Sequence, residues 1–337
     1  MTTATQDADW LDQPTILNAD ASALVAEVDQ IAAPVPPTVE QQAASADHPP
    51  ALAVELAGVY DITEADYHKD PVPEGSLSAS GAKLLMECPE KFAYRQQHGS
   101  EHRDYFDFGK AAHALVLGAG APVAILPFED FRTKDAKAAR DEAYARGETP
   151  MLAATWQTVQ AMADKIRQHP IASALLNPER GKPEQTLIWH DRIWRRALVD
   201  FMPNLDTDGR LIVTDYKTCA DASAQAFSRS AASYGYHQQD AWYLDGVRAV
   251  SGRTDVAFVF IAQEKEAPYV VNVIELTDSF RRIGAWRNEI AVDRYIAGMA
   301  SGRWPAYSTE VERVDAPRWT EIEHEEQREL HNEGVFQ

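Results

Sequence analysis

The spacing of apolar positions predicts helices in the first half of the chain and strands in its centre. The predicted helices include residues 83–86, 92–94, 110–117, 134–147, 152–168, much of 224–250, and about 278–299. The predicted strands lie between Thr186 and Tyr216, at 256–262 and at 269–274. Helices before and after a run of strands predict one α/β domain with a central sheet between helical layers.

Local signals set several of the helix ends. Ser78 or Ser80 is expected to cap the helix at 83–86, and Pro89 to open the next one. Gly118 is expected to end the helix that contains His113, because glycine adopts the left-handed conformation that follows many helices.

The central strands carry the most informative pattern. Asp208-Gly209 is a strong hairpin signal between two apolar, β-branched segments, and a two-residue turn there would pair Thr207 with Arg210. That register puts Asp200 opposite Lys217 with Asp215 on the diagonal, and all three on one face of the sheet. Pro203 weakens the pairing near the loop, and a one-residue slip would turn Asp200 to the other face.

These three residue types suit the hydrolysis of a phosphodiester. Carboxylates bind Mg²⁺ or Mn²⁺, which lowers the pKa of bound water and neutralises charge on a phosphate. A lysine beside the attacking water stabilises developing negative charge. On spacing alone, two solvated acids and a surface lysine are the commoner arrangement. The apolar run Leu211-Ile212-Val213 favours the site, because charges that end a buried strand are costly unless paired or bound to metal.

Four residues outside the hairpin are further candidates. His113 lies among small apolar residues of a predicted helix, where a hydrogen-bonded core histidine and a metal ligand are both reasonable. Gln239 and Tyr243 are four residues apart and share a helix face, either as a wall of a nucleic-acid cleft or as an ordinary polar contact and half-buried aromatic. Glu184, just before the first strand, is either a further ligand or an exposed acid.

Charge is distributed unevenly along the 337 residues, whose net charge is −20. Residues 1–70 hold thirteen acids against one lysine, giving −12, and residues 309–337 hold nine acids against three arginines, giving −6. The remaining residues are therefore nearly neutral at −2, which leaves room for a basic groove despite the acidic total. We divide the chain into an acidic, disordered arm at 1–55, a catalytic domain at 56–308 and an acidic C-terminal segment at 309–337.

Cysteines and apolar runs limit the setting. Two cysteines cannot form a four-thiolate zinc or iron–sulfur site, and nothing indicates a disulfide scaffold, so a reducing cytoplasm is expected. The sequence shows neither a bilayer-spanning apolar run nor a signal peptide, which predicts a soluble protein without a membrane partner.

Several segments, in order between residues 67 and 319, resemble one family. They are YHKDPVPEGSLSASGAKLLMECPEKFAYR, FDFGKAAHALVLG, FRTKDAKAARDEAYARGETPML, PEQTLIWHDRIWRRALVDFM, LIVTDYKT, YGYHQQDAWYLDGV, FVFIAQEKEAPYVV and GRWPAYSTEVERVDAPRW. Each segment is weak by itself, but the ordered set resembles the RecE-type (exonuclease VIII) branch of the PD-(D/E)XK nucleases, which is related to lambda exonuclease and to RecB nuclease domains. This implies a restriction-endonuclease-like core with a central mixed sheet flanked by helices.

The resemblance implies a role for each candidate. His113, Asp200 and Asp215 match metal ligands, Lys217 matches the catalytic lysine, and Glu184 matches an acid of less certain role. Gln239 and Tyr243 match the Q-x-x-x-Y motif of RecB-like nucleases. Leu198 departs from the family, where a basic residue is expected two positions before the aspartate; Arg195 and Arg196 are candidates to replace that contact with DNA. The cysteines of the iron–sulfur branch are absent.

The resemblance also implies an activity. It is that of a Mg²⁺-dependent, or Mn²⁺-dependent, exodeoxyribonuclease that digests one strand of linear duplex DNA from its ends, 5′ to 3′. The 3′ single strands would serve recombination through a single-strand annealing protein. A ring-shaped homo-oligomer and a bacteriophage or prophage gene acting in the bacterial cytoplasm are implied as well. The alternatives are a single-strand or flap nuclease, and a non-catalytic DNA- or protein-binding module. The arm is either a solubilising tail or a docking segment for the annealing partner.

Overall fold

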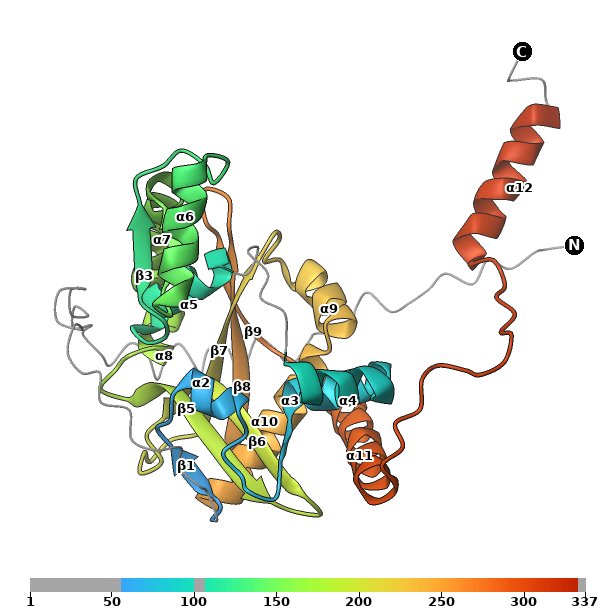
Figure 1. Cartoon of the computed structure of the whole chain (residues 1–337), viewed down its shortest axis with the longest axis horizontal. Helices are drawn as coiled ribbons and strands as arrows, with labels where there is room; N and C mark the ends of the chain where they lie inside the picture. Colours follow the sequence, from blue (N-terminus) through green and yellow to red (C-terminus); the bar gives the residue numbers. More distant parts are fainter. Residues whose placement is uncertain (1–55, 100–106, 333–337) are drawn as a thin grey trace, which may run out of the picture.

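The computed structural model describes residues 56–99 and 107–332. The predicted arm at 1–55 lies outside the described residues. Figure 1 shows a sheet in the middle of the molecule with helices packed around it, and helix α12 standing apart from this body.

The helices and strands follow the predicted order, with several additional short elements. The described helices are α2 (Glu64–His68), α3 (Ala79–Glu87), α4 (Pro89–His98), α5 (Asp107–Leu117), α6 (Lys134–Ala145), α7 (Ala153–Gln168), α8 (Pro170–Leu175), α9 (Ala224–Ser233), α10 (Tyr236–Ser251), α11 (Asp278–Ser301) and α12 (Arg318–Asn332). The described strands are β1 (Gly58–Tyr60), β2 (Leu77–Ser78), β3 (Val123–Leu126), β4 (Thr149–Leu152), β5 (Gly181–His190), β6 (Trp194–Pro203), β7 (Leu211–Cys219), β8 (Val256–Glu264) and β9 (Val271–Glu275).

The main sheet is mixed. Its strands run in the order β1-β5-β6-β7-β8-β9, and β2 pairs with β6 off this path. All neighbours along the path are antiparallel except β7 and β8, which are parallel, as are β2 and β6. A second, two-stranded parallel sheet joins β3 to β4. The prediction of an α/β fold with a central mixed sheet flanked by helices is confirmed.

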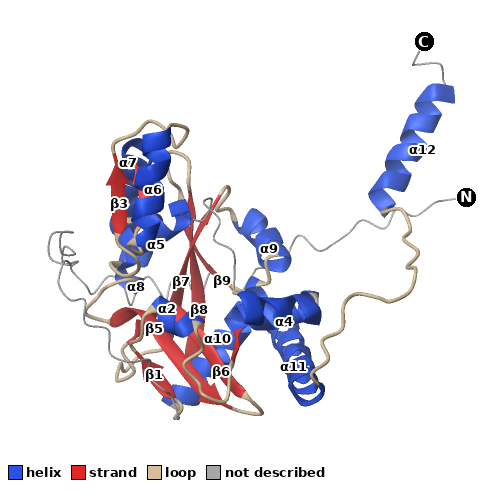
Figure 2. Cartoon of the chain, in the orientation of Figure 1, coloured by secondary structure: helices blue, strands red, loops and turns tan. Residues whose placement is uncertain are grey.

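Both faces of the sheet are covered by helices (Figure 2). One core packs Leu85 of α3, Trp242 of α10 and Ala291 of α11 against Phe258 and Phe260 of β8. A smaller core on the other face joins α5 and α7 to β7 and β8. Burial of a single large apolar side chain stabilises the fold by about 2 kcal/mol. The parallel pair β7 and β8 lies between these two layers, which accounts for the nearly continuous apolar sequence of β8.

The connection between β6 and β7 differs from the predicted hairpin. Phe201 pairs with Thr214, so the register places Asp200 opposite Asp215 and not opposite Lys217. The strands are joined by residues 204–210, and not by a two-residue turn at Asp208-Gly209. The guanidinium group of Arg253 donates to the carbonyl oxygens of Thr207 at 2.6 Å and Gly209 at 2.5 Å. These hydrogen bonds fix the conformation of the longer loop. Because the shift is two residues, the side chains keep the predicted face.

The predicted helix across 224–250 is divided in two. Gly235 lies between α9 and α10 with a φ of 66°, in the left-handed region that glycine adopts without strain. Because of this break, a new helix, α10, begins beside β7, and its first residues lie next to Lys217. Other ends agree with the predictions: Ser78 caps α3 by accepting from the Gly81 amide at 3.1 Å, Pro89 opens α4, and α5 ends before Gly118.

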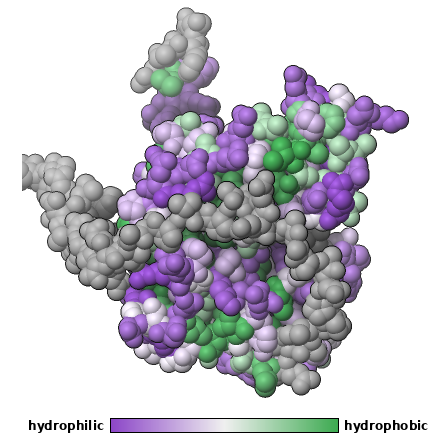
Figure 3. Space-filling model, turned by 90° about the vertical axis from the view of Figure 1, so that its left-hand side faces the viewer, coloured by the Kyte–Doolittle hydropathy of each residue, from purple (hydrophilic) through white to green (hydrophobic). Residues whose placement is uncertain are grey.

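The C-terminal part of the described chain leaves the body after Tyr307, whose hydroxyl group accepts a hydrogen bond from Lys91 at 2.8 Å. No residue of α12 is buried. Figure 3 shows one face of the molecule on which the coloured apolar residues form small, separate patches among polar ones. No helix within the described residues is long and apolar enough to cross a membrane.

Candidate functional site

Strands β6 and β7 bring the two aspartates and the lysine together. Lys217 Nζ lies 2.5 Å from Oδ2 of Asp215. Asp200 reaches across from β6, and its Oδ2 accepts a hydrogen bond from the backbone amide of Tyr216 at 2.8 Å. The Asp215 side chain is only 1% exposed, whereas those of Lys217 and Asp200 are 25% and 14% exposed. The group is therefore buried at one end and open to solvent at the other.

His113 joins this group from α5. Its Nε2 lies 3.1 Å from Oδ2 of Asp200, and its Nδ1 lies 3.6 Å from Oε1 of Glu184 on β5. The small residues Ala111 and Ala112 are fully buried against the sheet, which allows α5 to come close enough for this contact. The structure thus gathers His113, Glu184, Asp200, Asp215 and Lys217, which are called the acidic cluster below.

Gln239 and Tyr243 border the cluster from α10. Gln239 Nε2 donates to Oδ1 of Asp215 at 2.6 Å, so its amide orients the carboxylate that pairs with the lysine. The Tyr243 hydroxyl donates to the carbonyl oxygen of Leu198 at 2.7 Å and thereby fixes β6 two residues before Asp200. Tyr243 is buried, so the described contacts give it a positioning role. Contact of either residue with DNA stays a prediction.

The pKa values of Asp215 and Lys217 each depend on the charge of the other residue. Burial and the charge of Asp200 raise the pKa of Asp215 to about 6, although Lys217 opposes this shift. Burial tends to lower the pKa of Lys217, but the charges of Asp215 and Asp200 outweigh it and raise that pKa. Lys217 therefore remains an ammonium group at neutral pH and acts here as a fixed positive charge.

In the other half of the cluster, burial and neighbouring charges also compete in setting the pKa values. Burial opposes the charged forms of His113 and Asp200, yet their mutual attraction outweighs it, raising the pKa of His113 and lowering that of Asp200. Burial raises the pKa of Glu184. The charge of Glu64 on α2 also raises the pKa of Glu184. Glu64 was not predicted to lie near the cluster, because a five-residue helix gives no sequence signal for where it packs.

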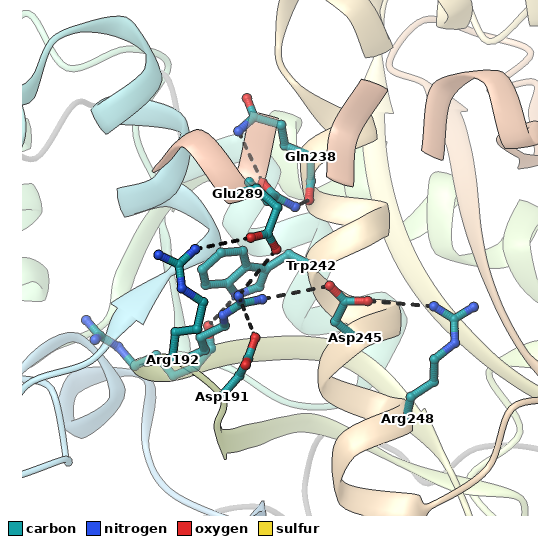
Figure 4. A network of polar contacts seen from close by, with 10 residues as sticks. Asp191, Arg192, Gln238, Trp242, Asp245, Arg248 and Glu289 are labelled. Atoms are coloured by element: carbon teal, nitrogen blue, oxygen red, sulfur yellow. Dashed lines mark hydrogen bonds and ion pairs between the residues drawn. The ribbon is translucent and has the colours of Figure 1, made fainter. Parts of the chain in front are cut away.

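Arg195 is buried in a separate ion-pair network with Asp191, Asp245 and Glu289. Figure 4 shows these three acids around Trp242. The guanidinium group lies 2.9 Å from Asp191 and within 4 Å of Asp245 and Glu289. It also lies 5.0 Å from the centre of the Trp242 ring. Its side chain is only 2% exposed, so it links β6 to α10 and α11 and leaves no free surface for the predicted contact with DNA.

Arg196 is likewise paired away from the acidic cluster. Its Nη1 lies 2.8 Å from Asp70 and donates to the Ser76 carbonyl oxygen at 2.5 Å. These contacts hold the segment before β2 against the start of β6. Burial of both arginines follows from strand pairing: β5 and β2 lie on either side of this end of β6. The structure therefore does not bring Arg195 or Arg196 to the site.

The donor types in the cluster fit a divalent cation. Asp200, Asp215 and Glu184 offer hard oxygen atoms, and His113 offers an imidazole nitrogen. Within residues 56–99 and 107–332, the structure contains no group of three or more His, Cys, Asp or Glu side chains that is already arranged as a complete metal site. Their donor atoms instead pair with one another and with Lys217. A cation would replace these internal pairs as the partner of the carboxylates.

The comparisons with known proteins agree with this geometry. Residues 78–317 match a protein-family model described as a PDDEXK-like domain of unknown function. The chain belongs to this family. The match to a PDDEXK-like domain supports membership of the PD-(D/E)XK nuclease superfamily and does not distinguish its RecE-type branch. A search of curated proteins found no match.

A solved structure shares the fold of this PDDEXK-like domain. It is the crystal structure of a candidate exonuclease from Eubacterium rectale, with a TM-score of 0.53 and 14% sequence identity. The similarity covers 77% of this chain and 97% of the other. At this identity the likeness establishes the fold alone.

Proposed function

We propose that this PDDEXK-like domain is a metal-dependent exodeoxyribonuclease that hydrolyses one strand of linear duplex DNA from its ends. The observation that carries the proposal is the acidic cluster, in which two strand-borne aspartates, a histidine and a charged lysine meet at a partly open site. Family membership supports a nuclease fold, and the cluster supplies the residue types that phosphodiester hydrolysis needs.

Asp200, Asp215 and His113 would hold the metal, with Glu184 as a further candidate ligand. Mg²⁺ is the expected ion and Mn²⁺ is an alternative, since both accept carboxylate oxygens and an imidazole nitrogen. When bound, the ion lowers the pKa of a water molecule and neutralises charge on the phosphate.

The chain's own residues orient the reaction. Gln239 fixes one oxygen of Asp215 and leaves the other facing Lys217. Lys217 donates hydrogen bonds to the attacking water or to a phosphate oxygen, and its positive charge opposes the negative charge that builds up there. In hydrolysis the water oxygen bonds to phosphorus, one phosphorus–oxygen ester bond breaks, and the water proton passes through solvent to the departing oxygen.

The finer parts of the proposal follow the RecE-type resemblance. They are 5′ to 3′ polarity, release of 3′ single strands to an annealing protein, a ring-shaped homo-oligomer that encloses DNA, and a phage gene acting in the bacterial cytoplasm. The first three have direct readouts: product polarity, co-purification with the annealing protein, and mass in solution.

The decisive residue test replaces Lys217. Lys217→Met should lower the rate of Mg²⁺-dependent digestion by a factor on the order of 10³, because an electrostatic contribution to the transition state is lost. The variant should remain folded, which its circular dichroism spectrum checks. Lys182→Met is the matched control, since Lys182 is an exposed lysine on neighbouring strand β5, and its rate should equal the wild-type rate. Equal rates for Lys217→Met and the wild type would refute the assignment.

A further inference from the structure

A second lysine, Lys83 of α3, points to an additional binding site beside the acidic cluster. Lys83 is half-buried, and its ammonium group forms no hydrogen bond or ion pair with any residue that the structure describes. A half-buried cation without an anionic partner is unfavourable, since burial removes hydration that nothing in the chain replaces. Burial and the charge of Lys217 lower the pKa of Lys83 to about 8.

Lys83 and Lys217 both lie near the ring of Tyr236. Lys83 Nζ lies 5.7 Å from the centre of the Tyr236 ring, and Lys217 Nζ lies 5.6 Å from the same centre. Lys217 already has Asp215 as its partner, whereas Lys83 has only the aromatic ring. The two ammonium groups lie at similar distances from one ring, so two neighbouring anionic groups of a single extended ligand could each meet one of them.

The start of α10 adds to the positive character of this position. A Cβ atom placed on Gly235 would lie 3.4 Å from Cδ of Lys83, so the lysine stem passes directly beside this glycine. Gly235 offers no side chain to cap the helix, and no acid lies in its first turn. The partial positive charge at the N-terminus of this 16-residue helix is therefore not offset by a nearby acid on the helix itself.

We propose that Lys83, together with the start of α10, binds a backbone phosphate of the DNA strand adjacent to the phosphate that is cleaved. The proposal rests on the proposed nuclease function and extends it to substrate positioning. Lys83 lies beside the cluster, near the Tyr236 ring that Lys217 also approaches. The bound phosphate would fix the strand so that its neighbour meets Lys217 and the metal ligands.

The test measures how the loss of charge at single phosphates weakens DNA binding. A set of linear duplexes each carries one uncharged methylphosphonate at a different position near the strand end, and affinity is measured in EDTA so that no strand is cut. Wild-type protein should lose affinity at several positions, and at the position that Lys83 contacts the loss should be about tenfold, which corresponds to about 1.4 kcal/mol. Lys83→Met should bind the unmodified duplex about tenfold more weakly, show no further loss at that position, and remain sensitive elsewhere.

Two further variants separate contact from structure. Lys83→Arg, which keeps the charge, should restore the position-specific loss. Lys91→Met removes a lysine of α4 that already pairs with Glu87 and Tyr307, and it should behave as wild type. If Lys83→Met lowers the melting midpoint, Lys83→Gln provides the same comparison with a polar side chain of similar length.

The outcomes distinguish this site from the nuclease proposal. Wild-type cleavage with an unchanged interference pattern in Lys83→Met and Lys83→Gln would overturn the Lys83 site and leave the nuclease assignment standing. Absence of both cleavage and duplex binding in the wild type would overturn both. In multiple-turnover digestion, Lys83→Met should mainly raise KM, whereas Lys217→Met should mainly lower kcat.

Discussion

At the scale of single residues, the buried carboxylates Asp215 and Asp240 have different surroundings. Asp215 is buried beside Lys217 and accepts from Gln239, and it belongs to the acidic cluster. Asp240, the next residue after Gln239, is fully buried on α10. Its Oδ1 lies 3.3 Å from Nε of Arg281, and its Oδ2 has no hydrogen-bond partner among the described residues. Asp240 therefore offers a pH-dependent property that is separate from the cluster.

Asp240 should make the fold less stable as the pH rises toward neutrality. Burial raises its pKa to about 7, above an ordinary value of about 3.9, so between these pH values the folded state binds more protons than the unfolded state. The favourable contribution of the protonated form is present below about pH 4 and is lost as the pH rises through about 7. Asp240→Asn removes this titration while keeping the shape of the side chain.

Denaturant unfolding at pH 5 and pH 8 provides the measurement. Relative to wild type, Asp240→Asn should gain stability between these pH values by on the order of 1–2 kcal/mol. Arg281 retains Glu275 at 2.8 Å as its partner in the variant. A wild-type-to-variant difference that is the same at both pH values would contradict the raised pKa.

At the scale of elements, α10 holds the site together. It contributes Gln239 and Tyr243, and it packs closely against α11. A Cβ atom placed on Gly284 of α11 would lie 1.9 Å from the His237 carbonyl oxygen, so the two helix backbones approach where only glycine fits. The position of α11 therefore affects how α10 presents its first turn to β7.

Gly284→Ala should force these helices apart. We expect a loss of about 1–3 kcal/mol in the free energy of unfolding, since the obstructing atoms belong to the backbone and cannot rotate away. The matched control is Gly109→Ala on α5, where the nearest atom to the added Cβ is Thr218 Oγ1 at 3.8 Å. The control should be neutral or slightly stabilising, because alanine favours helix. Similar melting midpoints for both variants would show that α10 and α11 have room to adjust.

Local sequence predicted most elements but not the details that depend on distant residues. Alternation and turn signals placed β6 and β7, yet the loop between them depends on Arg253, more than forty residues away. Short-range rules favoured a tight Asp-Gly turn because they could not include this contact. The division of 224–250 had a local signal in Gly235, whose left-handed conformation ends one helix and permits the next.

At the scale of the whole molecule, the site gathers residues from several distant segments. Residue type and face alternation predicted that Asp200, Asp215 and Lys217 would share a surface. His113 and Glu184 were candidates from their residue types and positions, and the family resemblance matched both to family residues. Neither could show that Arg195 and Arg196 are buried in ion pairs, because their partners come from separate segments. Lys83 and Tyr236 were missed for the same reason: they meet only when α3 packs beside the start of α10.

The most direct test of the central claim is timed digestion by the full chain of linear duplex DNA labelled at either the 5′ or the 3′ end. Closed circular duplex, single strands and flapped duplex serve as parallel substrates, each with Mg²⁺, Mn²⁺ or EDTA. We predict metal-dependent loss of the 5′ label first, accumulation of 3′ single strands, and no digestion of closed circles. Preferential cleavage of single strands or flaps would favour the alternative nuclease class. The absence of metal-dependent cleavage of every substrate would contradict the account.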